Sequence, residues 1–339
     1  MYTFRPLPAW NHFCQASTFY QIHSKTVAGP DRTVSINGPL SGMSTTQRRL
    51  EQSLYWSCFK SECEIRVELP LPQSSIADFE YPHMFPSPPS PPLNFAPEIS
   101  QSPSYSRNAT SPAEMSKSYA KRWNEELSWY YYLTEVALRR ISNRIINTFY
   151  RKEHTSWLNI TPLIPMAEEF ETQISNWSAN LPVAMQYESG HNDGVVSPSQ
   201  ELGWATANRL LEMKAWLYQP FLYYAIHSPA LILDAPENQA LRVLVDAAME
   251  CNHSIIQNRS IQHRHHGVWF DIRALVTAAV VLSAVIKSGT MKVPTDWEES
   301  FCTVIRTLRF WEDESPDLRK TRGIVEGLLA DSRKSMGIS

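Results

Sequence analysis

The chain has 339 residues, of which 43% are hydrophobic and 11 are tryptophan, enough to bury a sizeable core. Its formal net charge is −3 and its basic residues fall in scattered pairs, which excludes whole-chain electrostatic attraction to nucleic acid. Five scattered cysteines lack the dense spacing of a secreted disulfide framework and favour a reducing compartment.

The N-terminal part of the chain, residues 1–69, is expected to be mostly helical. Apolar side chains recur over 46–69 at nearly helical spacing, and Pro70 and Pro72 end the pattern. We therefore predict a core helix here. Its expected apolar positions are Leu50, Leu54, Cys58, Ile65 and Leu69.

A connector rich in proline and serine is expected over 70–112, because this segment holds eleven of the 24 prolines. Such a composition gives an extended, loop-like segment. The connector separates the N-terminal part from a main helical domain at 113–332, which is followed by a short tail at 333–339.

The main domain is expected to begin with a long helix. Ser111 is placed as its N-cap, Pro112 as its first residue and Glu114 as its third, which together form a capping signature. The apolar spacing that follows predicts a helix of about 38 residues. Its expected face comprises Leu127, Tyr130, Thr134, Ala137, Ile141, Ile145 and Phe149, with Arg139, Arg140 and Arg144 interleaved.

Further helices are expected at 161–181, 201–227, 240–258, 267–287, 294–312 and from about 315 onward. Pro220 is expected to kink one of them, and 186–200 reads as a polar loop. The most apolar window, 274–286, is shorter than the roughly 20 residues that span a bilayer, so we interpret it as a buried core helix. No convincing strand pattern occurs. The sequence therefore predicts an all-α protein without a membrane partner.

Two groups of side chains raise the question of metal binding. Cys58 and Cys63 are five residues apart, so an unbroken helix turns them about 140 degrees away from each other, and buried or half-buried thiols are expected instead. The segment with His263, His265 and His266 has ligands for a divalent ion, but no HExxH motif accompanies it. We interpret this segment as a helix-entry loop.

Motifs of catalysis give no local support for an enzyme. The patterns GxSxG, GxGxxG and GxxxxGK[ST] do not occur in the chain. The acidic stretch WEDESPDL at 311–318 is interpreted as a helix start at Ser315 and Pro316, with its acids near the positive helix end. Arg264 has the chemistry to hold a carboxylate, either of this protein or of a ligand. We predict no catalytic, metal-binding or cofactor-binding residue.

Aromatic residues at helical spacing are interpreted mainly as core. The alternative is a pocket between helices for a small-molecule effector or a partner protein. The candidate lining residues, chosen from aromatic placement, are Tyr130, Trp216, Tyr223, Arg264 and Trp269.

Six stretches of the chain carry a family resemblance. They read LYWSCFKSECEIRVELPLPQSSIADFEYPHMFPSPP at 54–89, EELSWYYYLTEVALRRISNRIINTFY at 125–150, FETQISNWSANLP at 170–182, QPFLYYAIH at 219–227, RHHGVWF at 264–270 and WEDESPDL at 311–318. In this order and spacing they resemble the middle homology region, the helical regulatory region, of fungal zinc binuclear-cluster transcription factors. The resemblance covers roughly residues 9–329.

The resemblance implies a mainly helical regulatory domain. In the family this domain follows an N-terminal module, in which six cysteines hold two zinc ions and contact DNA, and a dimerisation segment. The five cysteines of this chain supply no counterpart of the zinc module, so no zinc or DNA contact carries over. Either the chain is encoded as this portion alone, or it is part of a longer factor whose missing segment binds zinc and DNA.

The leading hypothesis is the regulatory region of a fungal transcription factor in the nucleus, without catalysis; control of a biosynthetic gene cluster is plausible for the family. The alternative is a stand-alone interaction protein that dimerises with a full-length relative and restrains it. A third hypothesis is a helical ligand carrier or enzyme that uses the histidines at 263–266. Expected partners are a second copy or a related transcription factor, and a small-molecule effector.

Overall fold

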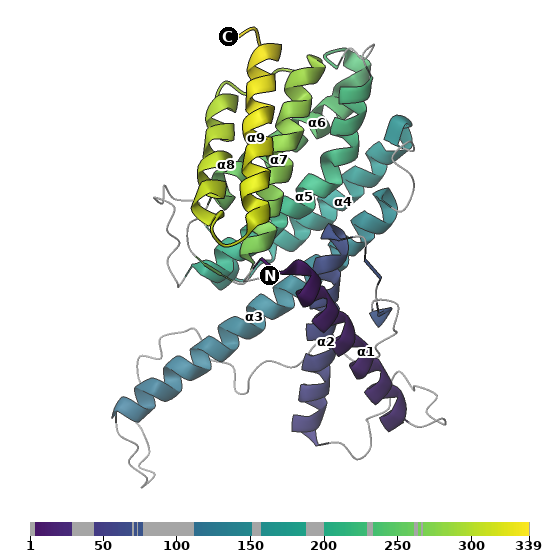
Figure 1. The fold of residues 1–339 in the computed structure, drawn as a ribbon. Coiled ribbons are helices and arrows are strands. Elements are labelled where there is room, and N and C mark those ends of the chain that lie inside the picture. Colours follow the sequence, from purple (N-terminus) through teal and green to yellow (C-terminus); the bar gives the residue numbers. More distant parts are fainter. Residues whose placement is uncertain are drawn as a thin grey trace. The chain divides into compact units, whose positions relative to one another are not determined.

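The computed structural model describes residues 4–28, 44–69, 71–72, 74–76, 112–150, 157–187, 200–228, 233–260, 264–265 and 267–338 (Figure 1). These ranges contain α-helices and short 3-10 turns and no β-strand, which confirms the all-α prediction. Most of the predicted connector and of the polar loop lies outside the described residues. The helices are α1 Pro6–Ala28, α2 Thr45–Glu68, α3 Pro112–Phe149, α4 Ile164–Ala179, α5 Glu201–His227, α6 Gln239–Arg259, α7 Val268–Ser288, α8 Trp297–Trp311 and α9 Pro316–Ser335.

The chain forms two compact units. The N-terminal unit comprises residues 13–137 and 182–185, and the C-terminal unit comprises 1–12, 138–181 and 186–339. Helices α1 and α3 contribute residues to both units, because the boundaries after His12 and after Ala137 fall inside them. The division into 1–69, 70–112 and 113–332 that the sequence suggested stays a prediction.

The helix predicted at 46–69 is α2. Its start is fixed by a capping box, in which Ser44 Oγ accepts a hydrogen bond from the Gln47 N–H and Gln47 Oε1 accepts one from the Ser44 N–H. Its end at Glu68 follows from Pro70 and Pro72, because proline lacks the N–H that the next helical bond requires.

The buried face of α2 differs from the prediction. Leu50 and Leu54 are 61% and 49% exposed, while Tyr55, Phe59 and Ile65 are buried. The prediction was therefore wrong for the two leucines. Aromatic side chains bury more area than leucine, and the rings of Tyr55 and Phe59 stack at 6.1 Å. The helix therefore turns its aromatic side inward.

Helix α3 has the predicted 38 residues. Its proposed cap, Ser111, lies outside the described residues. Thr134, Ile145 and Phe149 are buried as expected, but Arg139, which the pattern placed among the polar residues, is only 2% exposed. A buried guanidinium requires a compensating negative charge nearby.

The C-terminal unit has two apolar cores. In the first, α3, α4 and α5 meet through Phe149, whose ring centroid lies 6.0 Å from Phe170 and 6.4 Å from Phe221. The second surrounds α7, which packs against α6, α8 and α9. Leu275 of α7 and Phe301 of α8 are fully buried in it. Figure 1 shows α7 running alongside α8 and α9.

Helix α7 contains the apolar window predicted to be a core helix. It is long and apolar enough to cross a membrane by length and composition, but 61% of that window is buried inside the protein. Leu275, Ala279 and Val285 have no exposed surface. The burial confirms the interpretation of this segment as core.

The other helices begin and end close to the predicted limits. Helix α5 matches the prediction at both ends, whereas α8 begins at Trp297 rather than at 294. The residues before α8 form a turn instead, in which the Trp297 N–H donates to the Pro294 carbonyl. Thr161–Leu163 likewise forms a 3-10 turn ahead of α4. Each turn contains or follows a proline, Pro294 before α8 and Pro162 before α4. Proline has no N–H to donate to a preceding carbonyl.

Pro220 lies buried inside α5. Its missing N–H leaves the Trp216 carbonyl, four residues earlier, without its helical partner. The Tyr150 hydroxyl donates to this carbonyl at 2.7 Å. A side chain at the end of α3 therefore replaces the backbone bond that proline removes from α5. The predicted kink of α5 stays a prediction.

Candidate functional site

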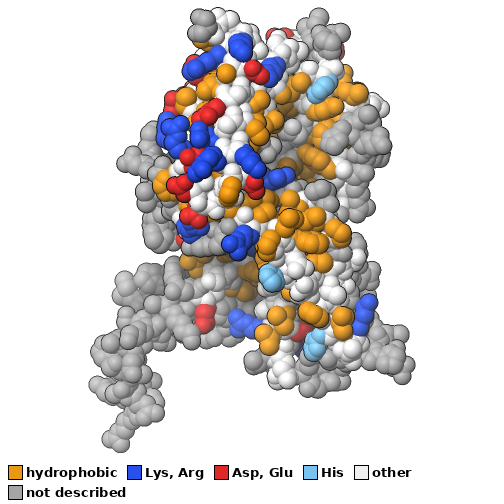
Figure 2. Space-filling model, in the orientation of Figure 1, with side chains coloured by type: hydrophobic (Ala, Val, Ile, Leu, Met, Phe, Trp, Pro, Cys, Tyr) orange, Lys and Arg blue, Asp and Glu red, His pale blue; other side chains and the backbone are white. Residues whose placement is uncertain are grey.

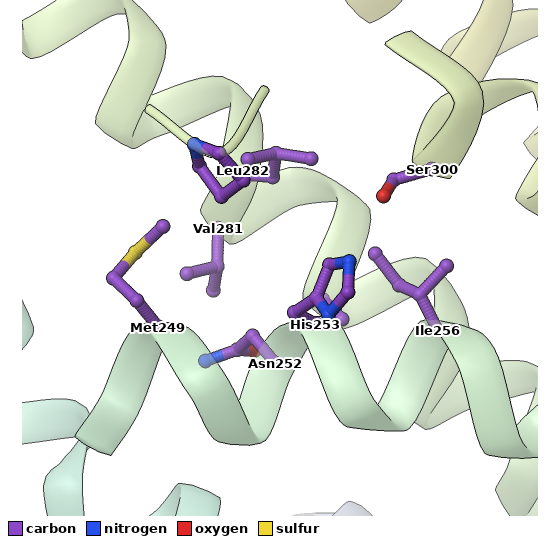
Figure 3. Close-up of a pocket in the computed structure, with 9 residues that line it drawn as sticks. Met249, Asn252, His253, Ile256, Val281, Leu282 and Ser300 are labelled. Carbon is purple, nitrogen blue, oxygen red and sulfur yellow. The ribbon is translucent and has the colours of Figure 1, made fainter. Parts of the chain in front are cut away.

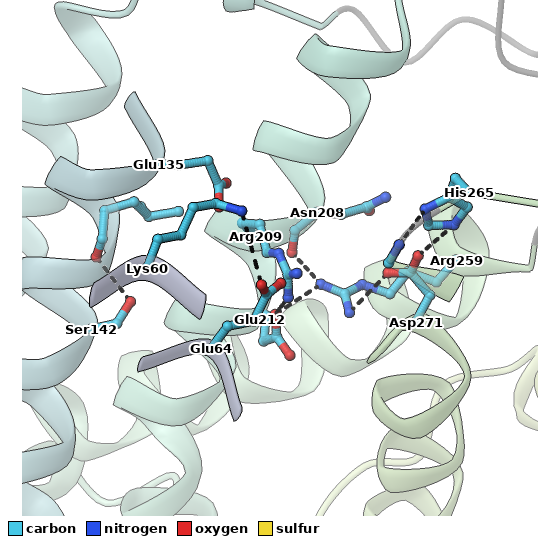
Figure 4. Close-up of polar contacts among 12 residues, drawn as sticks. Lys60, Glu64, Glu135, Ser142, Asn208, Arg209, Glu212, Arg259, His265 and Asp271 are labelled. Atoms are coloured by element: carbon cyan, nitrogen blue, oxygen red, sulfur yellow. Dashed lines mark hydrogen bonds and ion pairs between the residues drawn. The ribbon is translucent and has the colours of Figure 1, made fainter. Parts of the chain in front are cut away.

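The most unusual polar feature of the C-terminal unit is a buried charge cluster, in which the end of α6 and the start of α7 meet the side of α5 (Figure 4). Asn208, Arg209 and Glu212 come from α5, and Arg259 is the last residue of α6. The connection to α7 adds His265, and the first turn of α7 adds Asp271. These six residues are hereafter called the charge cluster.

Arg259 is the centre of the charge cluster, with no exposed surface. Its Nη2 donates to the Asn208 carbonyl at 2.5 Å and lies 3.4 Å from Glu212 Oε2. Its Nη1 lies 3.2 Å from Asp271 Oδ1. One guanidinium thus joins α5, α6 and α7, and both of its carboxylate partners are buried.

Glu212 is held in its charged form. Burial raises the pKa of its carboxyl, but the positive charges of Arg259, Arg209 and Arg139 outweigh burial and lower the pKa to about 2. Arg209 also donates to Glu212 at 3.1 Å and lies over the Phe270 ring. The buried Arg139 of α3 is thus one of the positive charges that act on this carboxylate.

The geometry fixes the tautomer of His265. Its Nδ1 accepts a hydrogen bond from the Gly267 N–H at 3.2 Å, so the neutral ring carries its proton on Nε2, 3.0 Å from Asp271 Oδ2. The ring meets Trp204 edge-on at 5.2 Å. A Cβ at position 267 would lie 3.3 Å from the imidazole, so a larger residue there would have to displace the His265 ring by a few tenths of an ångström.

The acids and bases of the charge cluster therefore neutralise one another. Such a network fixes the relative positions of the three helices that supply it, because removing one member leaves a buried charge uncompensated. A signal was present in the sequence, since Trp204, Asn208 and Glu212 lie at four-residue steps on one face of α5. Our sequence reasoning missed it, because the partners are about 50 residues away.

The N-terminal unit has its own buried acid. Glu135 of α3 has no exposed surface and lies 3.8 Å from the Lys60 ammonium of α2. Lys60 also pairs with Glu64, one turn later on α2. This ion pair joins α2 to α3 within the unit (Figure 4).

The histidines and cysteines give no metal site in the described part of the chain, where no group of three His, Cys, Asp or Glu side chains has metal-binding geometry. His265 belongs to the charge cluster, and His263 and His266 lie outside the described residues. Cys58 is half-buried, and burial raises the pKa of its thiol. The Cys63 side chain is outside the described part.

The acidic stretch at 311–318 is a helix start, as predicted, because α9 begins at Pro316. Its acids bind arginines: Glu312 pairs with Arg322 at 2.6 Å, and Glu314 pairs with Arg264. The carboxylate that Arg264 holds is therefore one of this protein, and its guanidinium also lies over the Trp311 ring. Figure 2 shows basic and acidic side chains mixed over α8 and α9.

The five candidate pocket residues fall in different surroundings. Tyr130 belongs to the N-terminal unit, where its ring meets Trp129, and the other four belong to the C-terminal unit. Trp216 packs against the first core and Trp269 against the second. Tyr223 stacks on His227 at 4.0 Å. The ligand pocket proposed for these residues stays a prediction.

A pocket lined by other residues lies between α6, α7 and the start of α8 (Figure 3). Its volume of about 10 Å³ is close to the space that one water molecule needs. It is lined by Met249, Asn252, His253, Ile256, Ala278, Val281, Leu282, Pro294 and Ser300.

Ser300 and His253 of this pocket, with Asp296, have the composition of a hydrolytic triad. His253 Nε2 lies 2.7 Å from Asp296 Oδ2, but the buried Ser300 Oγ has no hydrogen-bond partner. In a working triad the acid and the nucleophile bind opposite ring nitrogens. The His253–Asp296 pair joins α6 to the start of α8, and Ser300 makes no hydrogen bond to it.

No known protein family, curated protein or solved structure that was compared with the chain matches it.

Proposed function

We propose that this chain is the helical regulatory region of a nuclear transcription factor of the fungal zinc binuclear-cluster type. The support is the ordered series of resembling stretches together with the all-α architecture that such a region implies. Zinc and DNA would be bound by a segment outside this sequence. The proposal assigns no catalysis to the chain.

Two of the resembling stretches contribute residues in or around the charge cluster. Arg139 lies in the resembling stretch 125–150 and His265 in the stretch 264–270, and the charge of Arg139 acts on Glu212 of the same cluster that holds His265. A buried network of this kind holds its members in fixed relative positions, as a folded regulatory domain requires.

A tethering experiment tests the proposal. The full chain is fused to an unrelated DNA-binding domain, and a reporter gene with the matching site is measured in a fungal host. We expect reporter expression to change by several-fold relative to the DNA-binding domain alone. A matched fusion with Arg259→Met should lose the effect at equal protein level, and Arg306→Ala at the surface should keep it. An unchanged reporter with well-folded fusion protein overturns the regulatory role.

A second candidate function is a stand-alone interaction protein that restrains a full-length relative. Helix α1 favours it, because its 23 residues hold a single formal charge, Lys25, and expose Phe19 and Ile22. Interfaces are depleted of charge at their centre. Co-expression with a full-length factor distinguishes the two candidates. A stand-alone interaction protein should form a stable complex with the factor and reduce its reporter output. The tethered chain alone should then leave the reporter unchanged.

A further inference from the structure

A socket in the N-terminal unit holds three residues of the chain itself. Beyond α2, Ile76 has no exposed surface and packs in a cluster with Tyr20 of α1 and with Tyr55 and Phe59 of α2. Trp56 and Cys58 pack against the same cluster. A single aliphatic side chain thus fills a site that two aromatic helix faces form.

The N–H, carbonyl and hydroxyl groups of Ser74 all form hydrogen bonds with the two helices. Glu62 of α2 accepts the Ser74 N–H through Oε1 and the Ser74 hydroxyl through Oε2, both at 2.5 Å. Gln21 of α1 donates through Nε2 to the Ser74 carbonyl at 2.7 Å. One residue is therefore bound at its backbone donor, its backbone acceptor and its side chain, and main-chain hydrogen bonds of this kind also give affinity in peptide-binding sites.

Local preference does not keep this segment in place. Ser75, between the two bound residues, is exposed and has φ of 65°, a left-handed conformation that is unfavourable for residues other than glycine. Strain of this kind persists only where the surroundings impose it. The socket therefore determines the conformation of the segment. The backbone strain at Ser75 lowers the free energy needed to release the segment, so a ligand that binds more tightly can displace it.

We propose that this socket is a peptide-docking site and that Ser74–Ile76 is its resident ligand. The geometry selects a partner protein that presents Ser or Thr two residues before Ile, Val or Leu, because the hydroxyl meets Glu62 and the aliphatic side chain meets the aromatic rings. The resident is joined to α2 by only a few residues, so its effective concentration is high and it keeps the socket closed to weak ligands. The proposal is independent of a transcriptional role.

Peptide binding to the full-length chain tests this proposal. The probe is a fluorescently labelled peptide with the sequence LPQSSIAD, and its anisotropy is measured against the wild-type chain and against Ile76→Asp. An aspartate cannot enter the aromatic socket, so the site should be open in the variant. We expect the variant to bind the peptide about tenfold or more tightly than the wild type does.

Two controls distinguish specific docking from non-specific binding of the peptide. Adding Glu62→Gln to the Ile76→Asp chain should abolish binding, and so should replacing isoleucine by aspartate in the peptide. Because Ile76→Asp can damage the unit, hydrogen exchange of α1 and α2 is measured in parallel, together with the milder Ser74→Ala variant. Ser74→Ala should also bind the peptide more tightly than the wild type.

The proposal is overturned by either of two results. If α1 and α2 stay protected from exchange in Ser74→Ala and the peptide binds no better than to the wild type, the segment has no exchangeable role. If both variants lose the protection of α1 and α2, Ile76 is a permanent part of the core rather than a ligand of it.

Discussion

The Tyr150 hydroxyl donates a hydrogen bond of 2.7 Å to the Trp216 carbonyl, which Pro220 leaves without a helical partner. Burial raises the pKa of Tyr150, so the hydroxyl keeps its proton. A proline in the middle of α5 is thus tolerated because another helix supplies the missing donor.

Replacing Tyr150 by phenylalanine should destabilise the C-terminal unit by about 1–3 kcal/mol, because a buried carbonyl is left unsatisfied. Chemical denaturation followed by tryptophan fluorescence measures the change. The double variant Tyr150→Phe with Pro220→Ala should recover most of the loss, since the alanine N–H can bond to Trp216. Additive losses in the two variants would contradict this explanation.

Because Arg259 lies at the centre of the charge cluster, replacing it should reduce the stability of the C-terminal unit strongly. Arg259→Met leaves Glu212 and Asp271 without their central partner and should destabilise the unit by about 3–5 kcal/mol. The matched control is Arg306→Ala, which removes an exposed pair with Glu299 and should change stability by less than about 1 kcal/mol. Similar unfolding midpoints for the two variants would show that the charge cluster does not stabilise the packing of α5, α6 and α7.

Acid should weaken the C-terminal unit through Glu212. Its pKa is about 2 in the folded chain, below its ordinary value, so its contribution to stability is fully present above about pH 4.5 and is lost as the pH falls toward 2. The loss should be on the order of 3 kcal/mol. Unfolding free energies of the wild type and Glu212→Gln are compared from pH 6 to pH 2. The variant should be less stable at pH 6, and the difference should shrink toward pH 2; a constant difference would contradict the assignment.

Two glycines of α9 should be stabilising when replaced by alanine. An added Cβ at Gly323 or Gly327 meets nothing within 4 Å, so each alanine should stabilise the helix by about 0.5–1 kcal/mol. Gly289 is the control, because it ends α7 with φ of 64° and its alanine variant should destabilise. Thermal unfolding measures all three. A loss of stability in the α9 variants would indicate that another chain approaches this face closely.

Local rules were enough to locate the helices from the sequence. The 38 residues of α3, both ends of α5 and the proline start of α9 follow from prolines and apolar spacing, which act over a few residues and can therefore be read in order. The apolar window of α7 likewise identified a core helix.

Only the tertiary structure decided which faces are buried and which charges meet. Leu54 and Tyr55 are neighbours in an equally helical pattern, and the aromatic partners in space determine which one turns inward. Arg139, Glu212 and Arg259 are spread over 120 residues of sequence. The opposite charges of these buried side chains offset the cost of removing each of them from water. Hydrogen bonds and Coulomb attraction between distant segments depend on distance in space, which the order of residues does not contain. The sequence by itself therefore determined the all-α class, and packing decided the sites.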